Sequence, residues 1–143
     1  MVSTTAKEML RAHIAGELAG DIDATMAPLS DYPIWVTPTH RIEGRDAVRA
    51  LYERVLKVSI AGLMDEYLRA LDDPQVTKWG ESHCVIEYSD EYPLHRGWVS
   101  VVHFDGDRVA GEHAYVTLPD QMKRYGEGSG EDFEALPGVT RRT

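Results

Sequence analysis

Two histidines and a tyrosine are the residues of this chain best suited to acid–base chemistry. A histidine titrates near neutral pH, so His13 and His113 could each give or take a proton at little cost. Tyr115 could donate a hydrogen bond to a carbonyl or enolate oxygen. We therefore expect His113, assisted by Tyr115 and His13, to act on a carbonyl-bearing hydrophobic molecule. The alternative is that each histidine is a hydrogen-bonded residue of the core.

A tight turn at Asp105-Gly106 determines where His113 and Tyr115 point, because both turn residues tolerate positive φ and strand-like segments flank them. Successive residues of a strand point to opposite faces, so a two-residue turn decides which side chains lie together. One face is predicted to carry Trp98, Ser100, Val102, Val109, Gly111, His113, Tyr115 and Thr117. The other is predicted to carry Val99, Val101, His103, Ala110, Glu112, Ala114 and Val116. Both faces are largely apolar, so one should cover the helices and the other a dimer partner.

Helical periodicity dominates the first part of the chain. Leu10, Ile14 and Leu18 recur at four-residue intervals and predict an amphipathic helix. Gly20 is expected to end that helix, and Asp21 to cap the next one. The predicted helices cover residues 5–19, 22–29 and 45–58.

Strand-like periodicity dominates the remainder, up to a polar C-terminal segment. The predicted strands cover residues 32–37, 40–43, 64–71, 76–79, 82–88, 95–104 and 108–118. Glycine and serine enrichment at 126–130 is typical of a flexible linker. We therefore predict an α+β domain over residues 1–126 and a flexible tail over 127–143. The domain is expected to be a cone-shaped, mostly antiparallel sheet of about six strands wrapped around three N-terminal helices and enclosing a pocket.

Length and charge narrow the class of protein. A chain of 143 residues is the size of one domain and can bury a full core. Its formal net charge of −9 disfavours binding to nucleic acid or to anionic membranes. A single cysteine excludes an internal disulfide framework, and neither a signal-peptide layout nor a membrane-spanning run is present. We expect a cytoplasmic protein.

Three short phrases resemble the nuclear transport factor 2-like superfamily, also called SnoaL-like. They are Ala19-Gly20-Asp21-Ile22-Asp23, Glu43-Gly44-Arg45-Asp46-Ala47-Val48 and Phe104-Asp105-Gly106-Asp107-Arg108-Val109. The resemblance implies a cone with a pocket at its wide end and a dimer interface on its convex side. It leaves the activity open, because the fold hosts isomerases, epoxide hydrolases, cyclases, dehydratases and binding proteins.

The resemblance also points to individual positions. Steroid isomerases of the superfamily carry a hydrogen-bonding tyrosine on the first helix, at the position of His13 here. Their proton-transferring aspartate ends the first strand, near Thr37. SnoaL-type cyclases carry an acid at the position of Thr117. This chain therefore lacks both carboxylates that those two reactions use.

Other residues are expected to have structural or binding roles. Trp35 and Trp98 should line the core or the pocket wall, and Thr37 is either a pocket residue or an ordinary strand residue. Cys84 lies between apolar neighbours and should be an inert small hydrophobe. No metal site is expected, because the residues that suggest one by type have no metal-site spacing: His83, Glu87, His103 and Glu112.

The leading hypothesis is a homodimeric protein that binds a polyketide, steroid-like or terpenoid molecule. It would act as a cofactor-free isomerase, cyclase, dehydratase or hydrolase, with no cofactor expected because nucleotide and metal motifs are missing. A second hypothesis is a non-catalytic carrier or sensor. A third is a dimerisation module whose interior is filled by Trp35, Trp98 and Tyr115.

Overall fold

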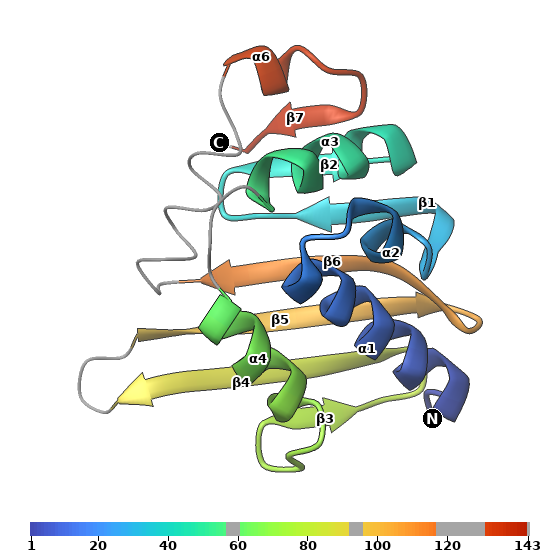
Figure 1. Cartoon of the computed structure of the whole chain (residues 1–143), viewed down its shortest axis with the longest axis vertical. Coiled ribbons are helices and arrows are strands. Elements are labelled where there is room, and N and C mark those ends of the chain that lie inside the picture. The colour runs from blue at the N-terminus through green and yellow to red at the C-terminus, as the bar shows by residue number, and fades with distance from the viewer. Residues whose placement is uncertain (57–60, 92–95, 117–130, 143) are drawn as a thin grey trace.

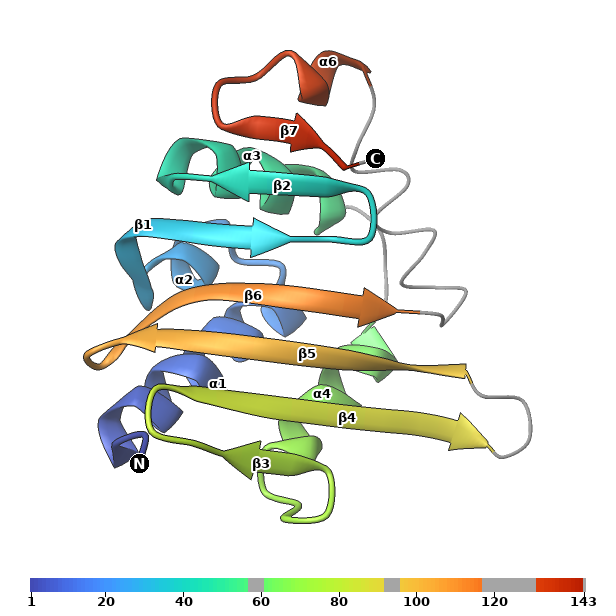
Figure 2. The same cartoon turned by 180° about the vertical axis from the view of Figure 1, so that it is seen from behind.

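A seven-stranded mixed sheet forms one layer, and the helices α1 to α4 lie on one of its faces (Figures 1 and 2). The structure, a computed structural model, describes residues 1–56, 61–91, 96–116 and 131–142. Within those ranges, side chains are described except at 61–64, 88–91, 96–98 and 116. The strand order is β3-β4-β5-β6-β1-β2-β7, antiparallel except for the parallel pair of β1 and β6. The α+β prediction is confirmed, with one strand more than expected and a sheet that is not closed.

Up to β6 the elements follow the predicted order, with one change of type. The helices are α1 (Thr4–Ala19), α2 (Ile22–Met26), α3 (Arg45–Val55), α4 (Ala61–Ala70) and α6 (Glu131–Glu134). The strands are β1 (Leu29–Val36), β2 (His40–Glu43), β3 (Thr77–Trp79), β4 (His83–Glu91), β5 (Arg96–Asp105), β6 (Arg108–Val116) and β7 (Val139–Arg141). Among the described residues, no helix is long and apolar enough to cross a membrane.

The corner between α1 and α2 forms as its residues predict. Gly20 adopts a left-handed conformation with φ of 68°, which a glycine tolerates without steric cost. The carboxylate of Asp21 accepts the backbone N–H of Ala24 at 3.0 Å and caps α2. This corner directs α1 across the sheet, so that Leu10 and Ile14 are buried against it.

The predicted strand at 64–71 is wrong, because most of this segment belongs to α4. Tyr67, Ala70 and Leu71 are its buried side chains, and a spacing of three and four residues is helical rather than alternating. Backbone N–H groups of Asp72 and Asp73 close the last turn on the carbonyls of residues 69 and 70. A fourth helix therefore covers the face of β4 and β5 (Figure 1).

A β-bulge in the hairpin of β5 and β6 changes which side chains share a face. Asp105 pairs with Arg108 across a two-residue turn, as predicted, but the register shifts by one residue after Phe104. Ala110 is the extra residue, since Phe104 pairs with Val109 and His103 pairs with Gly111. Every later residue of β6 therefore points to the face opposite the predicted one.

The predicted flexible tail is also wrong for residues 131–142. They form α6 and β7, and β7 pairs with β2 as the seventh strand (Figure 2). Phe133 is fully buried and belongs to the main core, with Leu136 and Val139 packed against that core. Burial of this apolar residue explains why the segment docks despite the glycine-rich sequence before it. The predicted tail residues 127–130 and 143 lie outside the described residues.

Candidate functional site

His113 and Tyr115 lie on the side of the sheet opposite the helices, so the prediction that they point towards a helix-covered pocket is wrong. The bulge is the cause, because it pairs Val101 with His113 and Val99 with Tyr115. Tyr115 is 52% exposed. The two rings stack at 4.2 Å, and the hydroxyl of Tyr115 lies 3.3 Å from Nδ1 of His113. The residues do contact each other as expected, but on the outer surface of the sheet.

The surroundings of His113 disfavour its charged form. Partial burial lowers the pKa of His113, and the positive charge of Arg142 and the nearby His103 lower it further. Within the described part of the chain, Nε2 of His113 is buried without a hydrogen-bond partner. His113 is therefore neutral at physiological pH.

His13 lies inside, between α1 and the sheet, and both of its ring nitrogens have partners. Nδ1 donates to the carbonyl oxygen of Thr25 at 2.7 Å. In the neutral ring this leaves Nε2 as the acceptor for the hydroxyl of Tyr52, at 3.0 Å. A carboxylate oxygen of Glu17 lies 4.0 Å from the same nitrogen, one helical turn away. The geometry gives His13 a fixed tautomer and a nearby acid.

Trp35 packs against this histidine. Its ring centroid lies 5.5 Å from that of His13 and 5.9 Å from that of Tyr52, and the side chain is 1% exposed. Its indole Nε1 is buried and, among the described residues, has no hydrogen-bond acceptor. A buried donor without an acceptor is costly, so this N–H is a group that a ligand oxygen could satisfy.

Of the remaining predicted binding residues, the structure describes the side chain of Thr37 alone. Thr37 is buried at the β1–β2 turn, where its hydroxyl accepts the backbone N–H of His40 at 3.0 Å. It therefore organises a turn rather than facing His13. The side chain of Trp98 and the whole of Thr117 lie outside the described residues.

The bulge brings a carboxylate to the helix-facing side that the predicted register had placed outside. Glu112 pairs with Trp35 of β1 and with Val102 of β5, both of which are buried beneath the helices. The hydroxyl of Ser100 donates to Oε1 of Glu112 at 2.7 Å. Glu112 is half-buried, so this carboxylate is neither sealed in the core nor fully solvated.

Tyr67 of α4 is within electrostatic range of the same carboxylate. Its burial raises the pKa of Tyr67 well above the usual range, and the negative charge of Glu112 raises it further. Ser100 opposes this shift, whereas Glu17 adds to it. Tyr67 therefore keeps its proton at neutral pH and remains a hydrogen-bond donor.

These side chains form one group, here called the inner polar cluster. Its members are His13, Glu17, Tyr52, Tyr67, Ser100 and Glu112. The cluster combines two carboxylates, two phenols, a hydroxyl and an imidazole on the helix-facing side of the sheet. Such a set can donate hydrogen bonds to a developing oxyanion and can exchange a proton with a carbon acid.

Sequence reasoning missed Glu112, Tyr67 and Glu17 for separate reasons. Glu112 was assigned to the wrong face because no local residue pattern marks the extra residue of a bulge. Tyr67 was not predicted as a site residue, because its helix was interpreted as a strand. Glu17 had a usable signal, since it lies four residues after His13 on the same helix.

Two other features contribute little to this site. Burial and the charge of Glu112 raise the pKa of the Cys84 thiol to about 12, which makes it unreactive at neutral pH. A surface hollow of about 350 Å³ beside α4 contains no member of the inner polar cluster among its lining residues, which are Glu66, Arg69, Ala70, Asp73 and Val76. In the described ranges, no group of three histidine, cysteine or acidic residues could hold a metal ion.

Solved structures with the same fold place this chain among known proteins, whereas no protein-family model and no curated protein matches its sequence. A nuclear transport factor 2-like protein of unknown function from Burkholderia xenovorans is 25% identical, with 83% of this chain and 88% of that chain covered and a TM-score of 0.52. A cystatin-like-fold protein from Silicibacter pomeroyi is 12% identical, with 92% and 94% covered and a TM-score of 0.57. A steroid delta-isomerase from Pseudomonas aeruginosa is 15% identical, with 89% and 90% covered and a TM-score of 0.55. The chain therefore has the cystatin-like α+β fold of the nuclear transport factor 2-like superfamily, which its helix and turn motifs predicted.

Proposed function

We propose that the protein binds a hydrophobic, oxygenated small molecule at the inner polar cluster and transfers a proton on it. The observation that carries this proposal is the position of Glu112. Its carboxylate lies on the helix-facing side, is half-buried, accepts a hydrogen bond from Ser100 and is near enough to Tyr67 to raise the pKa of that phenol. A carboxylate and a protonated phenol in one site are what enolisation of a ketone requires, as base and as oxyanion donor.

Each residue has a distinct part in this proposal. Glu112 takes a proton from the carbon next to the carbonyl and returns it to another carbon. Tyr67, whose pKa is raised, stays protonated and donates to the carbonyl oxygen as it gains negative charge. The Nε1–H of Trp35, buried and without an acceptor among the described residues, supplies a further donor for an oxygen of the ligand. The aromatic rings around it provide apolar contact.

The structural neighbours support the fold but do not identify the ligand. One of them is a steroid delta-isomerase, an enzyme named for a hydrophobic, oxygenated substrate. At 15% identity that likeness concerns the fold alone. The proposal therefore depends on the chemistry of Glu112 and Tyr67 in this chain.

Deuterium exchange tests this function without knowledge of the natural substrate. α-Tetralone, an apolar aryl ketone, is incubated with the protein in D₂O, and loss of its α-proton signal is followed by NMR. We expect exchange above the buffer rate, reduced about a hundredfold in Glu112→Gln because the general base is lost. Glu87→Gln is the matched control, since Glu87 is an exposed glutamate on β4. Exchange that is equal in both variants would contradict the proposal.

A non-catalytic carrier is the second candidate, and one observation favours it. Both ring nitrogens of His13 and one carboxylate oxygen of Glu112 already have hydrogen-bond partners within the protein. A cluster satisfied in this way could shape a binding site without turning over its ligand. Saturable quenching of tryptophan fluorescence by α-tetralone, with no deuterium exchange, would identify a carrier.

We also propose that the protein is a homodimer joined through the side of the sheet opposite the helices. Apolar side chains from three strands, β1, β4 and β5, lie on that side, namely Ile34, Val36, Val85, Val99 and Val101. All are half-buried, and an apolar sheet surface of this kind is stabilised when a second copy covers it.

A further inference from the structure

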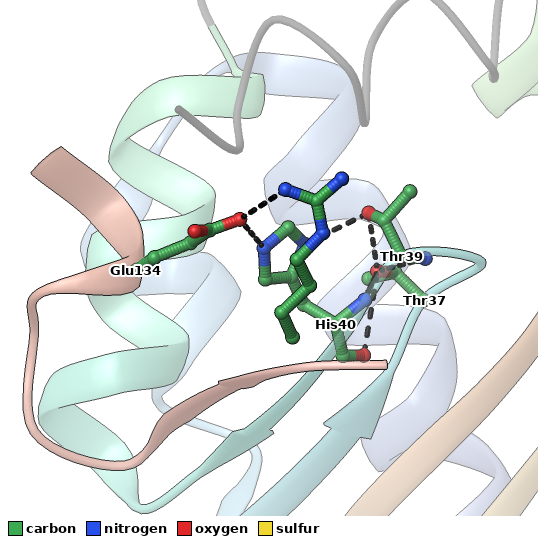
Figure 3. A network of polar contacts seen from close by, with 5 residues as sticks. Thr37, Thr39, His40 and Glu134 are labelled. Atoms are coloured by element: carbon green, nitrogen blue, oxygen red, sulfur yellow. Dashed lines mark hydrogen bonds and ion pairs between the residues drawn. The ribbon is translucent and has the colours of Figure 1, made fainter. Parts of the chain in front are cut away.

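A threonine, a histidine and a glutamate form a hydrogen-bonded chain at the β1–β2 turn, apart from the inner polar cluster (Figure 3). The hydroxyl of Thr39 lies 2.8 Å from Nδ1 of His40. Nε2 of His40 lies 2.9 Å from Oε1 of Glu134, which comes from α6. The imidazole is 3% exposed, whereas Thr39 is exposed at the surface. A reactive hydroxyl at this place would be open to solvent, with its base protected behind it.

The carboxylate determines which ring nitrogen carries the proton. A carboxylate oxygen can only accept, so Nε2 of neutral His40 donates its hydrogen to Glu134. Nδ1 is then unprotonated and accepts the hydroxyl hydrogen of Thr39. This is the arrangement of an activated nucleophile, in which a base accepts the hydroxyl proton and a third group orients the base.

Neighbouring groups hold the chain in place. The hydroxyl of Thr37 accepts the backbone N–H groups of Thr39 and His40, at 3.3 Å and 3.0 Å. The ring of Phe133 packs edge-on against His40 at 5.7 Å. These contacts fix the turn and the imidazole before any substrate arrives, which is the condition for efficient proton transfer.

The guanidinium of Arg142 places a positive charge beside the same turn. The backbone N–H of Arg142 donates to the carbonyl oxygen of Thr39 at 2.8 Å, and its guanidinium donates to the carbonyl oxygen of Thr37 at 2.8 Å. A guanidinium has five N–H donors and is always charged. It can therefore stabilise negative charge that develops on a substrate oxygen near Thr39.

We propose that Thr39, His40 and Glu134 form a second reactive centre, which transfers the acyl group of small activated esters. Oγ1 of Thr39 attacks the carbonyl carbon, while its proton passes to Nδ1 of His40. The bond from that carbon to the alcohol oxygen breaks, the proton moves from His40 to the departing oxygen, and an acyl ester remains on Thr39. Water then attacks this ester in the same way, releasing the carboxylic acid and restoring Thr39. Glu134 acts as a positioning residue that holds the tautomer and stabilises the charged imidazole.

The test uses p-nitrophenyl acetate and the full chain. We expect release of p-nitrophenolate, together with one acetyl group on the intact protein that peptide mass spectrometry assigns to Thr39. Thr39→Ala should abolish the acetylated species, and Thr39→Ser should retain it. Acetylation elsewhere, or an unchanged rate in Thr39→Ala, would overturn the proposal.

Two further variants separate positioning from folding. Glu134→Gln keeps an acceptor for Nε2 but removes the negative charge, so acylation should slow about a hundredfold. Arg141→Gln removes the other partner of Glu134, 3.5 Å away, while leaving the carboxylate in place, so its rate should stay near that of the unaltered chain. An acylation rate in Glu134→Gln equal to that in Arg141→Gln would refute a role for the carboxylate.

Discussion

Phe133→Ala should destabilise the protein strongly, because this ring anchors the C-terminal segment. The side chain is 0% exposed, is the one buried residue of α6, and contacts the imidazole of His40 and the guanidinium of Arg54. Replacing a buried phenylalanine by alanine costs about 3–5 kcal/mol. The lower end applies here, since α6 and β7 lie at a sheet edge and can detach instead of leaving a rigid cavity. We expect a loss of about 3 kcal/mol in the free energy of unfolding.

Urea denaturation followed by circular dichroism measures this loss directly. For a chain of this size, about 3 kcal/mol corresponds to a decrease in Tm of roughly 10 °C. Thr140→Ala is the control, because Thr140 is exposed on β7 and its substitution should stay within about 0.5 kcal/mol of the unaltered chain. A loss below about 1 kcal/mol in Phe133→Ala would show that the segment adds little to the core, and would refute its docking as the seventh strand.

Four further predictions concern the sheet and its cysteine. Gly111→Ala should cost about 2–3 kcal/mol in urea denaturation, because a Cβ there would lie 2.1 Å from the carbonyl oxygen of Ile34 and would force β1 and β6 apart; a near-neutral result would contradict this register. Cys84 should resist Ellman's reagent at pH 8 until the chain unfolds, since its pKa is about 12 and it is fully buried. Between about pH 9 and pH 12 the folded thiol keeps a proton that the unfolded thiol loses, so the free energy of unfolding should fall over this range. The fall should be steeper than in Cys84→Ala. Curves of stability against pH that run parallel in the two proteins would refute the raised pKa of Cys84. Val101→Asp should yield monomers in sedimentation velocity experiments in which the unaltered chain is a dimer, and an unchanged dimer would exclude this face as the interface.

The N-terminal half of the fold could be predicted because its signals are local. A glycine at the end of α1, a capping aspartate before α2 and an apolar stripe in α3 each act within a few residues. The buried residues of α3 recur at intervals of three and four along the helix and are Ala47, Val48, Leu51, Tyr52 and Val55. Such signals do not depend on where the rest of the chain lies.

The candidate site could not be predicted, because it depends on one inserted residue. The hairpin turn was located correctly, but Ala110 shifts the register and reverses the orientation of His113 and Glu112. Alternation alone fits both registers, since both faces of β5 and β6 carry apolar residues. Packing against β1, where Trp35 pairs with Glu112, determines which of the two registers forms.

The other two wrong predictions concern segments whose sequences did contain the correct signal. In each segment another feature pointed to a different structure. Tyr67, Ala70 and Leu71 have helical spacing, but the segment 64–71 is short enough to suggest a strand. Phe133, Leu136 and Val139 recur every three residues, yet the glycine-rich segment before them suggested a linker. In both places tertiary burial determined the structure.

The central claim is that the chemistry takes place on the helix-facing side of the sheet, at Glu112. A crystal of the protein soaked in α-tetralone tests this most directly through difference electron density for the ketone. The account predicts density with its carbonyl oxygen within hydrogen-bond distance of Tyr67 and its α-carbon facing the carboxylate of Glu112. Density found only against His113 and Tyr115, on the opposite side, would contradict it.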